Sequence, residues 1–336
     1  MVDDLEPKLK NALLKRAGEA LLHWPVPAQQ PNLLKYRENA VFRILLADGQ
    51  PAALRLHRAG YHDEAALQSE LAWMTALRRG GLAVPASIPT ADGRSLVPLA
   101  GGARFAAQHA DVVSWIDGAP LGQTGTPLAQ PPEKQAELFF RIGQAMAIMH
   151  DLADAWPQPP GFHRSAWDAD GLVGEQPLWG RFWDCPGLSP GESEALATLR
   201  NRLRQALDSH ASRLDYGLIH ADLVRENVFT TNGGVAFIDF DDCGPGYRLF
   251  DVATTLLKNR GEPTYPAIER ALIAGYRSRR SLSDETLAAL PLFLTLRSLT
   301  YIGWLAQRPE TPNAAGRLSR YLKESLQLAD ALQIDA

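Results

Sequence analysis

The sequence has few of the features that mark secreted, zinc-stabilised or membrane proteins. Only two cysteines occur in 336 residues, Cys185 and Cys243, and no Cys-x-x-Cys spacing is present, so neither a disulfide framework nor a structural zinc site is predicted. No apolar run approaches the roughly 20 residues that cross a bilayer. Residues 1–22 are charged with helical periodicity and lack the apolar core of a signal peptide. We therefore expect a cytoplasmic protein.

An excess of positive charge is missing as well. The formal net charge is -4 at pH 7, whereas surfaces that bind nucleic acids or anionic membranes are usually basic. We therefore expect neither a nucleic-acid partner nor a membrane partner. What the chain does contain is 46% hydrophobic and 21% charged residues, a composition typical of a folded globular protein. Its length suffices for one large or two modest domains.

The first part of the chain predicts a small antiparallel sheet with one long helix. Apolar stretches at residues 41–46 and 52–56 flank an Asp-Gly pair, which indicates a hairpin. Residues 63–81 carry leucines at helical spacing and end in a Gly-Gly pair, which predicts a helix of about four turns. Two short strands are predicted within residues 86–99, and a last strand begins at residue 111.

Beyond about residue 116 the pattern becomes mostly helical. Residues 119–132 are rich in glycine and proline and predict a flexible connection. We therefore predict an α+β, two-lobed, protein-kinase-like fold. It has a small antiparallel-sheet N-lobe with one long helix over residues 1–116 and a larger, mostly helical C-lobe over residues 117–336.

The stretch LIHADLVRENVF at residues 218–229 interrupts the helical pattern with a polar loop between apolar anchors. His220, Asp222 and Asn227 reproduce the H-x-D-x-x-x-x-N pattern of kinase catalytic loops. A carboxylate such as Asp222 can orient and deprotonate an acceptor hydroxyl, and His220 is expected to hold the loop. The alternative is a solvated turn in which Asp222 or Asn227 caps backbone groups.

A second element follows, where the strand-like run VAFIDFDD ends in Asp239. Kinases carry a metal-binding aspartate at this position after the catalytic loop. Magnesium that bridges phosphate oxygens prefers hard oxygen ligands, which the Asp239 carboxylate and the Asn227 amide carbonyl provide. The sequence therefore predicts a magnesium-dependent phosphoryl-transfer site.

These two segments, LIHADLVRENVF and FIDFDDCGPGYRLFDVATTL, closely resemble the aminoglycoside phosphotransferase and choline kinase superfamily. The resemblance implies that Asp222 is the catalytic aspartate and that Asn227 and Asp239 are the magnesium ligands. It also implies that Asp251 is a structural acid that braces the catalytic loop. Asp241 and its neighbour match an acidic extension, with ordinary surface charge as the alternative.

The nucleotide-binding half of the resemblance departs from protein kinases. No Gly-x-Gly-x-x-Gly loop is present, but RENAVFRI is similar to the superfamily's nucleotide-covering loop, and backbone N–H groups around Glu38 and Asn39 could cradle phosphate. Arg55 stands where a lysine is usual, with Glu70 as its partner by position. Because arginine is a planar fork rather than a point charge, it would reach phosphates differently. An ordinary surface pair is the alternative.

Acceptor-binding residues are expected in the helical half. Helical spacing puts Arg297, Tyr301 and Trp304 on one face of a late helix, where Arg297 is costly to bury unpaired and the two aromatics could equally pack in the core. Three acidic residues could attract a cationic acceptor or cap loops: Asp168, Asp170 and Glu175.

We therefore predict a phosphotransferase that moves the terminal phosphate of ATP, with Mg²⁺, to a hydroxyl of a small molecule such as an amino alcohol, amino acid or aminoglycoside. GTP stays open as the donor. Two alternatives stand beside this: a Ser/Thr protein kinase of the bacterial stress-response type, with a protein as substrate, and a nucleotide-binding pseudokinase that acts through partners.

Overall fold

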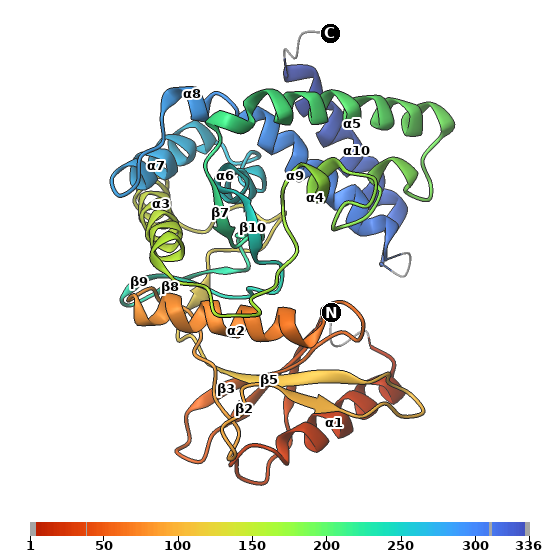
Figure 1. The fold of residues 1–336 in the computed structure, drawn as a ribbon, viewed down its shortest axis with the longest axis vertical. Helices are drawn as coiled ribbons and strands as arrows, with labels where there is room; N and C mark the ends of the chain where they lie inside the picture. The colour runs from red at the N-terminus through yellow and green to blue at the C-terminus, as the bar shows by residue number, and fades with distance from the viewer. Residues whose placement is uncertain (1–4, 38, 309–310, 333–336) are drawn as a thin grey trace. The chain divides into compact units, whose positions relative to one another are not determined.

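The computed structural model describes residues 5–37, 39–308 and 311–332 and has the predicted α+β class (Figure 1). The chain forms two compact units that alternate along the sequence. The first unit comprises Met1–Gly118, Trp156–His163 and Ala236–Asp241. The second comprises Ala119–Ala155, Arg164–Val235 and Asp242–Ala336. The division into lobes between residues 116 and 117 stays a prediction.

The first unit contains a five-stranded antiparallel sheet. Its order is β1 (Asn32–Tyr36), β2 (Ala40–Leu45), β3 (Pro51–Leu56), β5 (Gln108–Ser114) and β4 (Val97–Leu99). The predicted hairpin and the strand near residue 111 are confirmed, but β1 was missed. Of the two strands expected within residues 86–99, only β4 forms, and Ser87 makes an isolated bridge to Val113.

The two faces of this sheet carry different side chains because successive residues of a strand point to opposite sides. Helix α1 (Pro7–Leu21) belongs to the hydrophobic core that includes Phe42 and Leu54 on one face. On the other face, Arg55 of β3 reaches Glu70 of helix α2 (Glu64–Arg79), whose N-terminus is capped by Asp63. The predicted long helix is therefore confirmed as α2.

The second unit is mostly helical, as predicted beyond residue 116. Its helices are α3 (Pro132–Ala155), α4 (Ala169–Val173), α5 (Pro190–His210), α6 (Arg248–Leu257), α7 (Tyr265–Arg277), α8 (Asp284–Leu287), α9 (Leu290–Ala306) and α10 (Ala314–Ala331), with short 3₁₀ turns at Phe182–Asp184 and Ala211–Arg213. Strands β7 (Tyr216–Ile219) and β10 (Gly244–Tyr247) pair antiparallel, as do β6 (Ala119–Pro120) and β8 (Val228–Thr231). Strand β9 (Gly234–Phe237) follows β8 in the chain.

Helices α3 and α7 approach each other closely through two glycines. A Cβ atom on Gly143 would lie 2.1 Å from the Leu272 carbonyl oxygen, and one on Gly275 would lie 1.9 Å from the Phe140 carbonyl oxygen. Only glycine fits at such backbone distances. This approach lets a histidine of α3 meet a tyrosine of α7 beside the predicted catalytic loop.

One segment, Asp284–Ala306, is long and apolar enough to cross a membrane by length and composition, which corrects the expectation that no run reaches such a length. However, 72% of its apolar window is buried within the protein, and α9 contributes residues such as Phe293 and Ile302 to the core. A buried apolar helix is typical of the core of a large helical unit.

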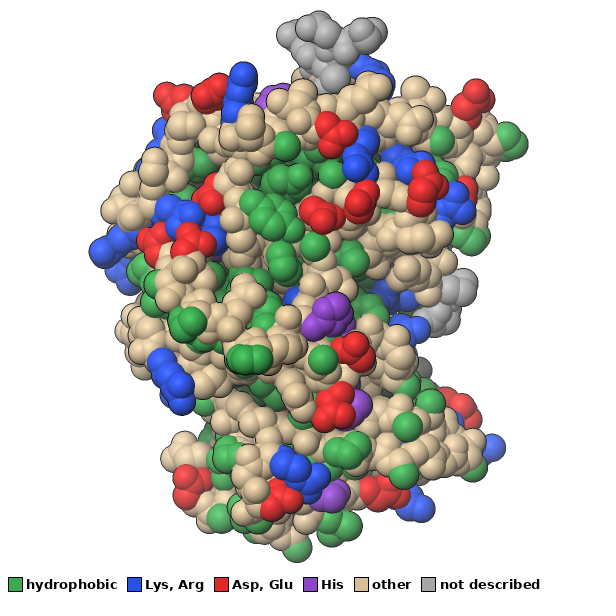
Figure 2. All heavy atoms as spheres, viewed as in Figure 1, with side chains coloured by type: hydrophobic (Ala, Val, Ile, Leu, Met, Phe, Trp, Pro, Cys, Tyr) green, Lys and Arg blue, Asp and Glu red, His purple; other side chains and the backbone are tan. Residues whose placement is uncertain are grey.

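On the face drawn in Figure 2, acidic and basic side chains are interspersed.

Candidate active site

The predicted catalytic loop lies between β7 and β8 of the second unit, as its apolar ends indicated. Ile219 and Val228 are fully buried and fix the two ends of the loop. Within it, Ala221 has a φ of 66°, a left-handed conformation that is uncommon for residues other than glycine. Because such a conformation is unfavourable for an L-residue, other contacts must hold it.

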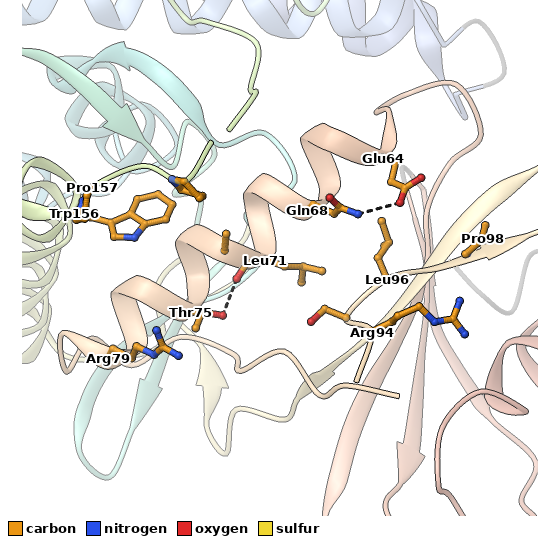
Figure 3. A pocket seen from close by; sticks show the side chains of 13 residues that line it. Glu64, Gln68, Leu71, Thr75, Arg79, Arg94, Leu96, Pro98, Trp156 and Pro157 are labelled. Atoms are coloured by element: carbon orange, nitrogen blue, oxygen red, sulfur yellow. Dashed lines mark hydrogen bonds between the residues drawn. The ribbon is translucent and has the colours of Figure 1, made fainter. Parts of the chain in front are cut away.

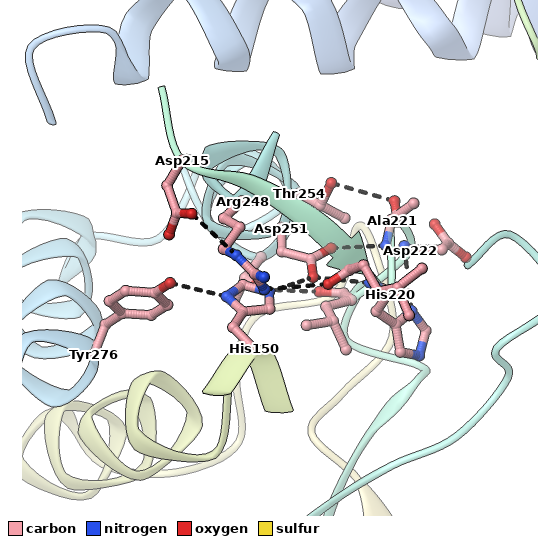
Figure 4. Close-up of polar contacts among 12 residues, drawn as sticks. His150, Asp215, His220, Ala221, Asp222, Arg248, Asp251, Thr254 and Tyr276 are labelled. Atoms are coloured by element: carbon pink, nitrogen blue, oxygen red, sulfur yellow. Dashed lines mark hydrogen bonds and ion pairs between the residues drawn. The ribbon is translucent and has the colours of Figure 1, made fainter. Parts of the chain in front are cut away.

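Asp251 of α6 supplies those contacts. Its carboxylate, which is fully buried, accepts hydrogen bonds from the backbone N–H of His220 at 2.9 Å and of Ala221 at 2.7 Å (Figure 4). Two charge-assisted bonds to consecutive N–H groups fix the backbone directly before Asp222. This geometry supports the bracing role that the family resemblance implied for Asp251.

Asp251 is in turn held by His150 of α3. His150 Nε2 lies 3.1 Å from Asp251 Oδ2, and His150 Nδ1 lies 2.9 Å from the Tyr276 hydroxyl. Burial lowers the pKa of His150, although the bond to Asp251 opposes this. The neutral ring therefore donates from Nε2 to the carboxylate and accepts from Tyr276 at Nδ1, which satisfies all three groups.

Asp222 presents a carboxylate whose two oxygens are both hydrogen-bonded. Oδ1 accepts from Arg297 Nη2 at 2.5 Å, and Oδ2 accepts from Asn227 Nδ2 at 2.9 Å. Asn227 Nδ2 also donates to the Asp222 backbone oxygen at 2.9 Å. Because a carboxylate can only accept, the amide nitrogen of Asn227 must face it, which leaves the carbonyl oxygen Oδ1 as the group that could bind a metal.

Arg297 of α9 is fully buried and lies among aromatic rings. Its guanidinium carbon is 4.5 Å from the ring centroid of Trp179 and 4.7 Å from that of Tyr301, and Nη2 is 3.2 Å from the Tyr301 hydroxyl. Burial alone would lower the pKa of Arg297, but Tyr301 and Asp222 raise it above its ordinary value. A charged, stacked arginine is therefore fixed beside Asp222.

The acidic residues considered for a cationic acceptor have other partners. Asp168 caps α4 by accepting from Gly171 N at 2.8 Å, Asp170 pairs with Arg204, and Glu175 pairs with Arg200. These three carboxylates act as a helix cap and as partners of α5 arginines in the second unit. Asp168 therefore acts as a cap, which was the alternative to attracting a cationic acceptor.

In the first unit, Arg55 and Glu70 form the predicted ion pair at 2.7 Å, but it is buried rather than a surface pair. Arg55 Nε and Nη2 also donate to the two oxygens of Asp111, at 2.7 and 2.6 Å. Asp111 stands directly opposite Arg55 in the β3–β5 pairing and also contacts His57 at 2.8 Å. The fork geometry of arginine matches a carboxylate in this way, whereas lysine would not.

The other predicted residues of the first unit are Asn39 and Asp239. Asn39 is buried, and its side-chain oxygen accepts from Arg58 N at 3.3 Å, while Glu38 lies outside the described residues. Asp239 has a φ of 66°, and its Oδ2 accepts from Lys35 Nζ at 3.0 Å. Asp239 therefore already holds a cationic group.

The acidic pair after Asp239 is not ordinary surface charge. Asp241 is buried in the first unit, and its backbone oxygen accepts from His62 Nε2 at 2.7 Å. Asp242, in the second unit, accepts from the indole N–H of Trp179 at 3.0 Å. In the described part of the chain, no three His, Cys, Asp or Glu side chains gather closely enough to hold a metal ion by themselves.

A pocket of about 670 Å³ lies along α2 within the first unit (Figure 3). Its lining includes Leu71, Thr75, Arg79, Arg94 and Trp156. No predicted site residue that the structure describes is among the lining residues. The pocket is therefore separate from the groups that carry the predicted chemistry.

Sequence reasoning missed four residues that the structure joins to the predicted site groups: Lys35, Asp111, His150 and Trp179. A correct prediction of the β3–β5 register would have identified Asp111, since Asp111 lies opposite Arg55. For the other three, no local motif marks their partners.

The comparison with known proteins identifies the family. A family model described as the phosphotransferase enzyme family matches residues 33–282. The chain belongs to this family. A solved structure of the microcompartment-associated aminopropanol kinase has a TM-score of 0.81 and 30% identity, and the match covers 94% of this chain and 96% of that chain. The predicted kinase-like fold and family are thus confirmed, and the protein is a kinase-type phosphotransferase.

Two further relatives of this phosphotransferase are informative. The homoserine kinase of Sinorhizobium medicae (strain WSM419) is 29% identical over 252 residues, which cover 71% of this chain and 69% of that protein. A structure of the amicoumacin kinase hAmiN in complex with AMP-PNP, Ca²⁺ and Ami has a TM-score of 0.77 at 22% identity, and the match covers 98% of this chain and 97% of that chain. Its nucleotide and divalent ion belong to that complex, while the fold is shared.

Proposed function

We propose that this phosphotransferase moves the terminal phosphate of ATP to a hydroxyl group of a small molecule with the help of Mg²⁺. The observation that carries the proposal is the Asp222 carboxylate. It is fixed through both oxygens and stands on a loop whose backbone is anchored by Asp251. A carboxylate fixed in this way is suited to align an acceptor hydroxyl and take its proton during transfer.

The metal role is proposed for Asn227 and Asp239. The orientation of Asn227 turns its carbonyl oxygen away from Asp222, and the Asp239 carboxylate holds the ammonium group of Lys35 at 3.0 Å. Both groups thus offer the hard oxygen donors that Mg²⁺ prefers, and few protein ligands suffice when phosphates provide the rest. Mg²⁺ held by such oxygen donors would neutralise charge on the transferred phosphate.

Nucleotide binding is proposed for the first unit, with Arg55, Glu70 and Asn39 shaping the site rather than all contacting phosphate. Three of the five N–H groups of Arg55 are engaged by Glu70 and Asp111, and the Asn39 side chain holds the start of the segment after β3. His220 and Asp251 are proposed to keep the catalytic loop in position.

The acceptor is proposed to be an amino alcohol, a hydroxy amino acid or an aminoglycoside-like molecule. Relatives of this chain are named as kinases of aminopropanol and of homoserine, which both carry an amino group and a hydroxyl group. Arg297 and Tyr301, which lie beside Asp222, are the proposed acceptor contacts. A cytoplasmic location is proposed as well, because ATP is supplied there.

The test is production of ADP from ATP and Mg²⁺ in the presence of a panel of amino alcohols, hydroxy amino acids and aminoglycosides. We expect turnover with at least one acceptor, together with a phosphorylated product detected by mass spectrometry. In the same assay, Asp239→Asn should abolish turnover, whereas Asp170→Asn, at an exposed pair with Arg204, should leave it unchanged. Near-normal turnover of Asp239→Asn would contradict the metal assignment. Phosphate found by mass spectrometry on a protein instead of a small molecule would indicate a protein kinase.

A further inference from the structure

The amino group of Lys35 lies against the proposed metal ligand of the first unit. Lys35 is the second-last residue of strand β1, just before the predicted nucleotide-covering loop, and its Nζ is 3.0 Å from Asp239 Oδ2. The two side chains are 41% and 30% exposed. The contact joins residues 204 positions apart in the sequence.

This ion pair contributes little to folding, because exposed pairs are screened by water and lose side-chain freedom. It does, however, place a cationic group at the carboxylate where a divalent cation is proposed to bind. A divalent cation held by the Asp239 carboxylate would compete with the ammonium group for its counter-charge and would repel it. An anion brought in with the metal would relieve this repulsion.

The cation of strand β3 is held in a buried ion-pair cluster. Arg55, at the position expected to grip phosphate, has a side chain only 7% exposed and is bonded through three N–H groups to two buried carboxylates. Moving it to a phosphate would leave Asp111 and Glu70 buried without their partner, which is strongly unfavourable. The Lys35 side chain is 41% exposed and has a flexible stem, and its partner Asp239 is 30% exposed, so turning the ammonium group to a phosphate would not leave a fully buried carboxylate without its partner.

We propose that Lys35 is a phosphate-binding residue of the nucleotide site. Its ammonium group leaves Asp239 for a phosphate oxygen when the metal–nucleotide complex binds, so that the phosphate-gripping cation of this chain comes from β1 instead of β3. The inference rests on the proposed function, because it requires that the chain binds ATP with Mg²⁺. It assigns Lys35 to the phosphates and not to the nucleoside.

Isothermal titration calorimetry on the full chain tests this assignment with two ligands: AMP-PNP with Mg²⁺, and adenosine, which has no phosphate. Loss of a charge-assisted contact by Lys35→Ala should weaken binding of Mg²⁺·AMP-PNP roughly ten- to thirtyfold, with adenosine binding unchanged. Lys35→Arg, which keeps the charge, should stay within about threefold of the wild-type protein. Lys15→Ala removes the same charge from an exposed position on α1 and should change neither affinity.

Two results would overturn the inference while wild-type binding is normal. Unchanged or tighter binding of Mg²⁺·AMP-PNP by Lys35→Ala would mean that Lys35 only neutralises Asp239. An equal loss of adenosine affinity would mean that the substitution disturbs the unit instead of removing a phosphate contact. If the wild-type protein bound no AMP-PNP at all, the proposed function itself would fail.

Discussion

Replacing Asp222 by asparagine separates the charge of the proposed catalytic group from its shape. In the native side chain, Oδ1 accepts from Arg297 and Oδ2 accepts from Asn227. Asparagine keeps one acceptor oxygen and gains an NH₂ group in place of the other. Because Arg297 and Asn227 both donate to this side chain, either orientation of the new amide sets a donor against a donor.

The structure gives two magnitudes for Asp222→Asn. Turnover should fall by roughly two to four decades, the span typical of a positioned general base. Stability should fall too, because Arg297 is fully buried and loses its counter-charge. Since Asp222 is itself 22% exposed, water can relieve part of this cost, and we expect a loss of about 1–3 kcal/mol in the free energy of unfolding.

Three measurements check the prediction: steady-state kinetics with the identified acceptor, calorimetric titration of Mg²⁺·AMP-PNP, and thermal melting. The control is Thr300→Ala, which removes a hydroxyl that accepts from Arg297 Nη1 at 3.3 Å without altering the Asp222 carboxylate. It should lower the melting temperature while retaining most turnover. Near wild-type turnover of Asp222→Asn would refute the catalytic assignment. An unchanged melting temperature would refute the role given to Arg297, and a loss of nucleotide affinity equal to the loss of rate would indicate a binding role.

Three more perturbations follow from buried charges. Arg55→Ala leaves two buried carboxylates without a cation and should cost about 3–5 kcal/mol in urea unfolding, with partial recovery on adding Asp111→Asn; no recovery would contradict the pairing. Asp251→Asn should leave one loop N–H without an acceptor, which lowers the free energy of unfolding by about 1–3 kcal/mol. It should also lower kcat while nucleotide affinity stays unchanged, and a normal kcat would argue against bracing. Burial lowers the pKa of Lys258 from 10.5 to about 8 in the folded protein. Because the unfolded chain holds this proton more tightly, the free energy of unfolding should rise as the pH increases from about 8 to 10.5. Lys258→Met should lack this rise and should be more stable than the wild-type protein near pH 7. Identical pH profiles of the two proteins in urea unfolding would contradict the prediction.

The sequence by itself determined the elements and their order. Two apolar stretches around an Asp-Gly pair predicted the β2–β3 hairpin, helical spacing and a glycine stop predicted α2, and the polar run between apolar anchors predicted the loop between β7 and β8. These signals are local, because they depend on the two- and 3.6-residue periods of strands and helices and on turn chemistry. Strand β1 was missed because it is short and lies at the sheet edge, where Leu33 is its only buried residue.

The tertiary structure decided which charges meet. Asp111 lies opposite Arg55 through strand register, 56 positions away, and this pairing places Arg55 in a buried ion-pair cluster. Arg297 reaches Asp222 over 75 positions, and Lys35 reaches Asp239 over 204. No periodicity or motif connects such residues, since their distances depend on how strands align and how helices pack. The sequence therefore predicted which groups carry the chemistry, and only the packed structure determined the charges that hold each of them in place.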